Sequence, residues 1–280
     1  MGFRGVFRTI LHPTDFSDTS GRAFDHALRI SLAAKGQLHL LHVSRGDADP
    51  GDLDAFPGVR QTLVDWGLLP EGTAREEVAE KIGVHVTKIE MIDRGAVRGI
   101  LRYLEENPTD LIVLATHGRQ GVPRWLQGSI TEPVTRQTSA ATLCIRHGAR
   151  GFVGPDGGEV TLRNVLVPID TAPDPGPAVD AAVILAQLMG AEDVVLHLLH
   201  VGEAANAPTI PAPVGPIRVE QIARPGEVVG EIVAAAGEVA ADLVAMTSAG
   251  RRGFLDEIRG STTERVLRDA PCPVLVVPAG

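Results

Sequence analysis

The sequence reads RTILHPTD at residues 8–15 and RNVLVPID at residues 163–170. Three further blocks recur in the same order: LHLLHV at residues 38–43 and 196–201, TDLIV at 109–113 with ADLVA at 241–245, and GRQG at 118–121 with GRRG at 250–253. Four matched blocks in one order indicate that the chain is a single unit written twice.

The two copies differ in length at one place. The shift between matched residues is 158 at the second block and 132 at the glycine block, so the second copy is about 26 residues shorter between them. The first copy has helical patterns there, near Val59–Trp66 and Ala74–Ile82, whereas the second has the proline-rich stretch 207–213, which cannot be helical. Between the copies, residues 148–158 hold five glycines and a proline. We therefore expect a first domain at 1–147, a linker at 148–160 and a shortened second domain at 161–280.

Each copy alternates short apolar runs with helical patterns. In the first copy, strands are expected near 7–12, 37–43, 84–92, 110–115 and 141–146, and helices near 18–35, 95–106 and 129–137. Gly36 and Gly190 stand where the first helix of each copy should end. The pattern predicts an α/β fold in which each copy forms a doubly wound, parallel, five-stranded sheet flanked by helices. The closing strands at 142–145 and 274–277 are apolar edges that need cover.

Composition limits the function classes. The chain of 280 residues is 44% hydrophobic and 4% aromatic, which is typical of globular domains with aliphatic cores. No apolar run approaches the roughly 18 residues of a membrane span, and the first ten residues do not resemble a signal peptide, so we expect a cytoplasmic protein. The net charge of −9 argues against nonspecific binding to nucleic acid or anionic lipid, and two cysteines do not form a disulfide framework.

The most distinctive motif is a glycine, nine residues and then glycine-serine. It runs from Gly118 to Gly128-Ser129 and returns from Gly250 to Gly260-Ser261. Glycine allows the main chain to approach a phosphate closely, and the helix that follows offers free N–H groups and a positive dipole end. In a doubly wound sheet, the loops after the first and fourth strands meet where the winding reverses, which is where ligands bind.

With these residues in order, the chain resembles a tandem universal stress protein, with an adenine nucleotide alpha hydrolase-like fold in each copy. ATP-binding members of that family carry G-x2-G-x9-G-S/T after the fourth strand and an aspartate after the first. The resemblance implies ATP as ligand, with or without Mg²⁺, and a site in the first copy made of Pro13, Thr14, Asp15, Val43, Ala115, His117, Gly118, Arg119, Gly128, Ser129, Ile130 and Thr131. It also implies that the two copies pair through their closing strands within one chain; whether two chains associate stays open.

The second copy departs further from the family pattern. Its corresponding residues are Pro168, Asp170, Val201, Thr247, Gly250, Arg251, Gly260, Ser261, Thr262 and Thr263. The first glycine of the motif is Ala115 in copy one and the larger, β-branched Thr247 in copy two, and Ile169 replaces Thr14. We therefore expect nucleotide binding in the first copy before the second.

Simpler interpretations stay open for several of these residues. Ser129 and Ser261 each begin an S-x-x-E capping box, and Asp15 and Asp170 are as well explained by helix capping as by ligand contact. The H-x-x-H pairs at 39–42 and 197–200 do not suit a metal, because residues three apart on a strand point to opposite faces. The sequence contains neither G-x-S-x-G nor H-E-x-x-H nor a Walker motif, so catalysis has little support.

Three hypotheses follow from the sequence. The first is a stress-response regulator that binds ATP in the N-terminal copy, where binding orders the 116–128 loop and so changes how the protein meets an unidentified protein partner. The second is a nucleotide-free scaffold that uses the paired copies. The third is a slow nucleotide hydrolase.

Overall fold

The computed structural model describes residues 7–45, 56–116, 130–248 and 262–279. The first half contains β1 (Thr9–Pro13), α1 (Asp18–Ala34), β2 (Gln37–Ser44), α2 (Val59–Asp65), α3 (Arg75–Ile82), β3 (His85–Ile92), α4 (Ala96–Glu106), β4 (Leu111–Ala115), α5 (Thr131–Gln137) and β5 (Ala141–Ile145). The second half contains β6 (Asn164–Pro168), α6 (Gly176–Leu188), β7 (Val195–Val201), the 3₁₀ turn η3 (Ala204–Asn206), β8 (Arg218–Arg224), α7 (Val228–Glu238), β9 (Leu243–Ser248), α8 (Thr262–Asp269) and β10 (Val274–Pro278). The predicted α/β fold class is confirmed.

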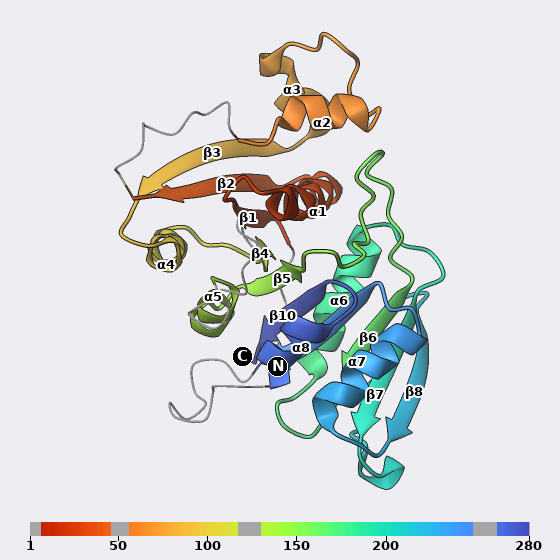
Figure 1. The fold of residues 1–280 in the computed structure, drawn as a ribbon. Helices are drawn as coiled ribbons and strands as arrows, with labels where there is room; N and C mark the ends of the chain where they lie inside the picture. Colours follow the sequence, from red (N-terminus) through yellow and green to blue (C-terminus); the bar gives the residue numbers. More distant parts are fainter. Residues whose placement is uncertain (1–6, 46–55, 117–129, 249–261, 280) are drawn as a thin grey trace.

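The strands form one sheet rather than two. Its order is β3-β2-β1-β4-β5-β10-β9-β6-β7-β8 (Figure 1). The two five-stranded halves join where β5 and β10 pair antiparallel, with Leu143 opposite Leu275, whereas the other strand pairings are parallel. The two predicted five-stranded parallel halves are thus joined edge to edge, and each closing strand covers the apolar edge of the other.

Helices cover both faces of this sheet, but the two faces are packed differently. Under α1 and α6, one hydrophobic core runs across both halves and includes Phe24 and Leu28 of α1 with Ala178 and Ala182 of α6. On the opposite face, the core under α4 and α5 is separate from the core under α7 and α8. The α1–α6 face therefore joins the two halves into one unit.

The length difference between the copies lies where the sequence placed it. The first half inserts α2 and α3 between β2 and β3, as predicted. The second half connects β7 to β8 by η3 and the proline-rich stretch, which forms no regular helix after Asn206. Its Val214 is 85% exposed, so this connection lies on the surface.

The glycines at the first helix ends have different roles. Gly190 follows α6 with a φ of +63°, the left-handed conformation expected there. After α1, however, Lys35 adopts that conformation with φ 47°. Gly36 is required for another reason, since a Cβ at this position would lie 2.1 Å from the Arg8 carbonyl oxygen.

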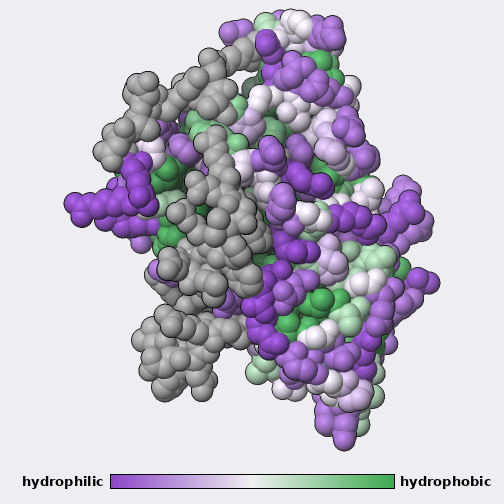
Figure 2. All heavy atoms as spheres, viewed as in Figure 1, coloured by the Kyte–Doolittle hydropathy of each residue, from purple (hydrophilic) through white to green (hydrophobic). Residues whose placement is uncertain are grey.

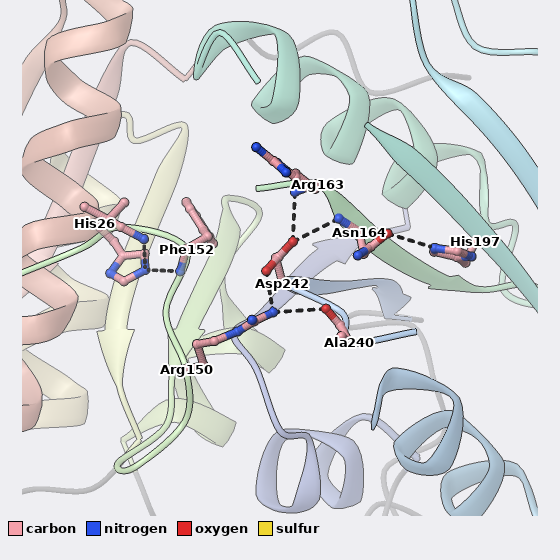
Figure 3. A network of polar contacts seen from close by, with 9 residues as sticks. His26, Arg150, Phe152, Arg163, Asn164, His197, Ala240 and Asp242 are labelled. Carbon is pink, nitrogen blue, oxygen red and sulfur yellow. Dashed lines mark hydrogen bonds and ion pairs between the residues drawn. The ribbon is translucent and has the colours of Figure 1, made fainter. Parts of the chain in front are cut away.

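The segment between the copies packs against both halves. Residues 149–162, here called the strap, bury Phe152, Val153 and Leu162 and fold back on themselves through a bridge between Val153 and Val160. On the first half, Nε2 of His26 accepts hydrogen bonds from the N–H groups of Phe152 and Val153 at 3.2 and 3.3 Å (Figure 3). The strap is therefore a structural element as well as a connection.

On the second half, the strap reaches an aspartate. Arg150 forms an ion pair with Oδ1 of Asp242 at 2.6 Å, while Oδ2 of Asp242 accepts from the N–H groups of Arg163 and Asn164 at 2.8 and 2.9 Å (Figure 3). Asp110 binds the start of β1 in the same way, through Oδ2. The repeated aspartates before β4 and β9 thus fasten the first strand of each half.

The surface is mostly hydrophilic on the face drawn in Figure 2, where apolar side chains form small separate areas. The exposed large apolar side chains among the described residues are scattered over loops, strand ends and one helix: Leu68, Ile92, Val214, Val219 and Val228. No helix in the described parts of the chain combines the length and apolar character that crossing a membrane requires.

Candidate functional site

The first and fourth strands of each half are neighbours. In the first half, Ile10 pairs with Leu111 and Leu11 with Ile112. The second half repeats this between β6 and β9. The winding of the sheet reverses between these strands, so the loops that follow them start side by side, as the sequence predicts.

Asp15 lies just beyond β1 and supports the start of α1 indirectly. Its Oδ1 accepts hydrogen bonds from the N–H and Oγ–H of Ser17, at 3.1 and 2.6 Å. Ser17, not Asp15, is the N-cap residue of α1 and accepts from the N–H of Ser20. The capping alternative for Asp15 is therefore wrong in its simple form, because the aspartate positions the cap instead of providing it.

Val43 offers main-chain groups at the end of β2. The carbonyl of Leu41 accepts from the N–H of Thr14, so main-chain groups at this position of β2 point toward β1. Residues two apart on a strand point the same way, and β1 ends at Pro13, opposite Leu41. The N–H and C=O of Val43 therefore face the space beyond the end of β1, while its side chain packs against Gly99 of α4.

The glycine loops themselves fall outside the described residues. This applies to His117, Gly118, Arg119, Gly128 and Ser129 in the first copy, and to Gly250, Arg251, Gly260 and Ser261 in the second. Their described flanks are Ala115, which ends β4, and Ile130 and Thr131, which begin α5. Thr131 is buried, with 4% of its surface exposed.

Histidines near the site have separate partners. Nδ1 of His42 donates to the carbonyl of Thr14 at 2.9 Å, whereas His39 hydrogen-bonds the Tyr103 hydroxyl, also at 2.9 Å. The second copy repeats this division, with His200 facing the Ile169 carbonyl at 3.4 Å. In the described part of the chain, no cluster of three or more histidine, cysteine, aspartate or glutamate side chains could hold a metal.

Sequence reasoning missed a buried polar group beneath the Asp15 loop. His12, fully buried on β1, donates from Nδ1 to the Val113 carbonyl at 2.9 Å and lies 3.4 Å from Oγ of Ser20. Ser20 in turn shares a 2.9 Å hydrogen bond with Oγ1 of Thr14. Burial lowers the pKa of His12 to about 4, against the opposing effects of the Val113 carbonyl and the Asp15 charge. A histidine inside an otherwise apolar strand was the available signal.

An aromatic group beside the loop was also missed. Phe16, with φ 61°, stacks on the His42 ring at a centroid distance of 4.3 Å, and Phe56 meets Phe16 edge-on at 5.3 Å. Phe16 and Phe56 lie 40 residues apart in sequence, so only the fold brings them together.

The corresponding loop of the second copy is built differently. Asp170 is exposed and binds the N–H of Thr171 at 2.7 Å, while the N-cap position of α6 is Pro175, so Asp170 does not cap that helix. Pro168 and Val201 end β6 and β7, and Thr262 and Thr263 begin α8. Thr247 is buried on β9, and its Oγ1 has no hydrogen-bond partner within the residues described.

Comparison with known proteins identifies the family. The model of the universal stress protein family matches residues 7–146 and 211–278, which is more than half of the chain. The chain belongs to the universal stress protein family. The match includes β1 to β5 of the first copy and β8 to β10 of the second.

Individual universal stress proteins align with about half of the chain. MJ0531 of Methanocaldococcus jannaschii is 27% identical over 150 residues, which are 50% of this chain and 83% of that protein. YxiE of Bacillus subtilis is also 27% identical over 150 residues and is covered completely.

Solved structures match the whole chain in fold. A universal stress protein from Archaeoglobus fulgidus superimposes with a TM-score of 0.62 at 23% identity, covering 97% of this chain and 98% of that one. Protein PA1789 of Pseudomonas aeruginosa, described as functionally unknown, superimposes with a TM-score of 0.66 at 17% identity. The match covers 98% of this chain and 93% of that one. Other proteins thus share the fold of the whole chain.

Proposed function

We propose that the first copy binds ATP at the carboxyl ends of β1, β2 and β4, and that the protein is a cytoplasmic stress-response regulator and not an enzyme. The observation that carries the proposal is the placement of Val43 and Asp15. Main-chain N–H and C=O groups that extend beyond a neighbouring strand suit the edge of an adenine ring, and a carboxylate beside them suits hydroxyls of a ribose. Family membership supports the same ligand class.

The phosphate part of the proposal rests on sequence. The loop that begins after Ala115 carries Gly118 and Gly128 and leads into α5. The first residues of α5 offer main-chain N–H groups to an anion. Arg119 adds positive charge to a chain with a net charge of −9. ATP, with or without Mg²⁺, fits this combination of an adenine edge and an anion-binding loop.

Titration calorimetry with ATP tests the proposal, with and without Mg²⁺. Asp15→Asn keeps an oxygen that can accept from Ser17 but removes the charge and one acceptor, so ATP binding should weaken by about tenfold. Asp170→Asn is the matched control in the second copy and should leave the affinity unchanged.

The outcomes separate the hypotheses. Absence of binding by the unaltered protein at millimolar ATP would refute the proposal and favour the scaffold hypothesis. Equal weakening by both variants would place nucleotide in both copies. Phosphate release above background, abolished by Asp15→Asn, would replace the regulator by a slow hydrolase.

A further inference from the structure

The loop between β1 and α1 is held by the side-chain hydroxyl and the carbonyl of Thr14. Its Oγ1 accepts from the N–H of Phe16 at 3.1 Å and hydrogen-bonds with Oγ of Ser20 at 2.9 Å. Its carbonyl accepts from Nδ1 of His42. Thr14 and Ser20 are only 7% and 1% exposed, so water does not compete for these contacts. Asp15, the next residue, therefore has little freedom to move.

His12 extends this group of contacts to β4. The Val113 carbonyl can only accept, so Nδ1 of His12 carries the proton and Nε2 is left as an acceptor facing Ser20. Burial holds the pKa of His12 near 4, which keeps the ring neutral near neutral pH. Val113 lies two residues before Ala115, where the chain leaves β4 for the glycine loop. The buried group thus connects the loop after β1 to strand β4.

The second copy provides an internal comparison. At the positions of His12, Thr14 and Ser20 it has Val167, Ile169 and Pro175. It nevertheless forms the corresponding strand and helix, joined by a longer loop, with Val167 fully buried and Ile169 5% exposed. Apolar residues therefore suffice for the fold at this place, and buried polar groups are costlier than apolar ones unless they are fully paired. A structural role alone does not account for the polar set in the first copy.

We propose that His12, Ser20 and Thr14 form a positioning network that fixes Asp15 relative to β4 and so confines tight nucleotide binding to the first copy. This proposal rests on the proposed function. Its physical basis is preorganisation: a loop that is already held in its binding conformation loses less conformational freedom when the ligand binds. The second copy, which lacks the network, leaves Asp170 exposed on a loop supported by hydrocarbon side chains.

Two substitutions at Thr14 separate positioning from packing. Thr14→Val keeps the shape and removes the hydroxyl, whereas Thr14→Ser keeps the hydroxyl and removes a methyl. We expect Thr14→Val to weaken ATP binding about fivefold or more and Thr14→Ser to change it less than about twofold, as the loss of one or two buried hydrogen bonds implies. Ile169→Val, the matched control in the second copy, should leave ATP affinity unchanged.

A second measurement does not depend on nucleotide. Hydrogen exchange of the Phe16 amide, which donates to Oγ1 of Thr14, should accelerate in Thr14→Val but not in Thr14→Ser. A merely structural hydroxyl would instead lower the unfolding midpoint while the ATP affinity and the Phe16 exchange stay unchanged.

These readouts distinguish the two proposals. If the unaltered protein binds ATP and Thr14→Val binds equally well, the network is refuted while the proposed function stands. If the unaltered protein does not bind ATP, the proposed function fails, and unchanged Phe16 exchange in Thr14→Val would refute the network as well. Accelerated exchange in that case would support the network as the element that holds the loop.

Discussion

Replacing His26 by leucine tests how the strap is held on the first half. The buried ring donates from Nδ1 to the Arg22 carbonyl at 2.8 Å, and its Nε2 accepts from the N–H groups of Phe152 and Val153. Leucine fills similar volume but leaves both strap N–H groups without an acceptor. Because each orphaned buried donor costs about 1–3 kcal/mol, His26→Leu should lower the free energy of unfolding by about 3 kcal/mol near neutral pH.

The loss of unfolding free energy caused by His26→Leu should be smaller in acid. Burial lowers the pKa of His26 to about 4 in the folded protein, from the ordinary value of 6.5 that the unfolded chain has. The unfolded state therefore binds the extra proton first, and the stability contributed by neutral His26 is present above pH 6.5 and is lost as the pH falls toward 4. At about pH 5 this loss amounts to about 2 kcal/mol in the original protein. Leucine cannot titrate, so at this pH the difference in unfolding free energy between the original protein and His26→Leu should fall to about 1 kcal/mol.

Trp66 provides the signal for this measurement. It is 7% exposed, and its Nε1 donates to the carbonyl of Pro155 in the strap at 3.0 Å. In a Trp125→Phe background it is the remaining tryptophan, since the chain has two, and urea unfolding can be followed by its fluorescence at about pH 7.5 and about pH 5. His85→Leu, at an exposed position of β3, is the control and should change stability by less than about 0.5 kcal/mol at either pH. If the difference in unfolding free energy between the original protein and His26→Leu is the same at both pH values, His26 does not hold the strap as a neutral acceptor.

Three further predictions concern stability and are measured by calorimetric or urea unfolding. Asp242→Ala should destabilise the protein by about 3–5 kcal/mol, because it leaves two N–H groups and Arg150 of the strap without their partner. Asp110→Ala leaves only two N–H groups without a partner and should cost about 2 kcal/mol. Equal costs would show that the ion pair of the strap does not contribute to stability. Gly36→Ala should destabilise by several kcal/mol through its clash with main chain, while Gly21→Ala, in α1 with no atom within 4 Å of the new Cβ, should stabilise by about 0.5–1 kcal/mol; similar effects would contradict the clash. Leu143→Ala, at the β5–β10 junction, should cost about 2–5 kcal/mol and keep a single unfolding transition, since one core spans both halves; two transitions would show that the halves unfold separately.

Local patterns in the sequence predicted the elements well. The apolar run Leu111–Ala115 and the helical pattern near Ala74–Ile82 coincide with β4 and with α3 to within a residue. Both succeed because burial on two faces or on one helical stripe is a local requirement that each segment meets by itself. The duplication added long-range information, since the matched blocks placed corresponding strands in both halves.

Contacts between segments that are distant in the sequence could not be predicted from such local patterns. Five glycines suggested a connection between the domains, yet Phe152 and Val153, which lie among those glycines, are the residues that anchor it. Near the candidate site, the sequence singled out Asp15 but did not identify Ser17 as the N-cap residue, and the contact between His12 and Ser20 joins a strand to a helix. Spacing within one segment carries no information about which side chain from another segment will meet it.

The asymmetry of the halves follows from the shared sheet. All five residues of β5 are buried, and an apolar strand of this kind cannot be left at the edge of a sheet in water. Here β10 covers that edge, and α6 continues the core that α1 begins. The second copy therefore stabilises the first whether or not it binds a ligand. That role is independent of its loop after β6, so Ile169 and Val167 can replace polar groups there without loss of the fold. A first half that carries the proposed nucleotide site and a second half that completes its sheet and core explain why the polar network under Asp15 occurs in one copy alone.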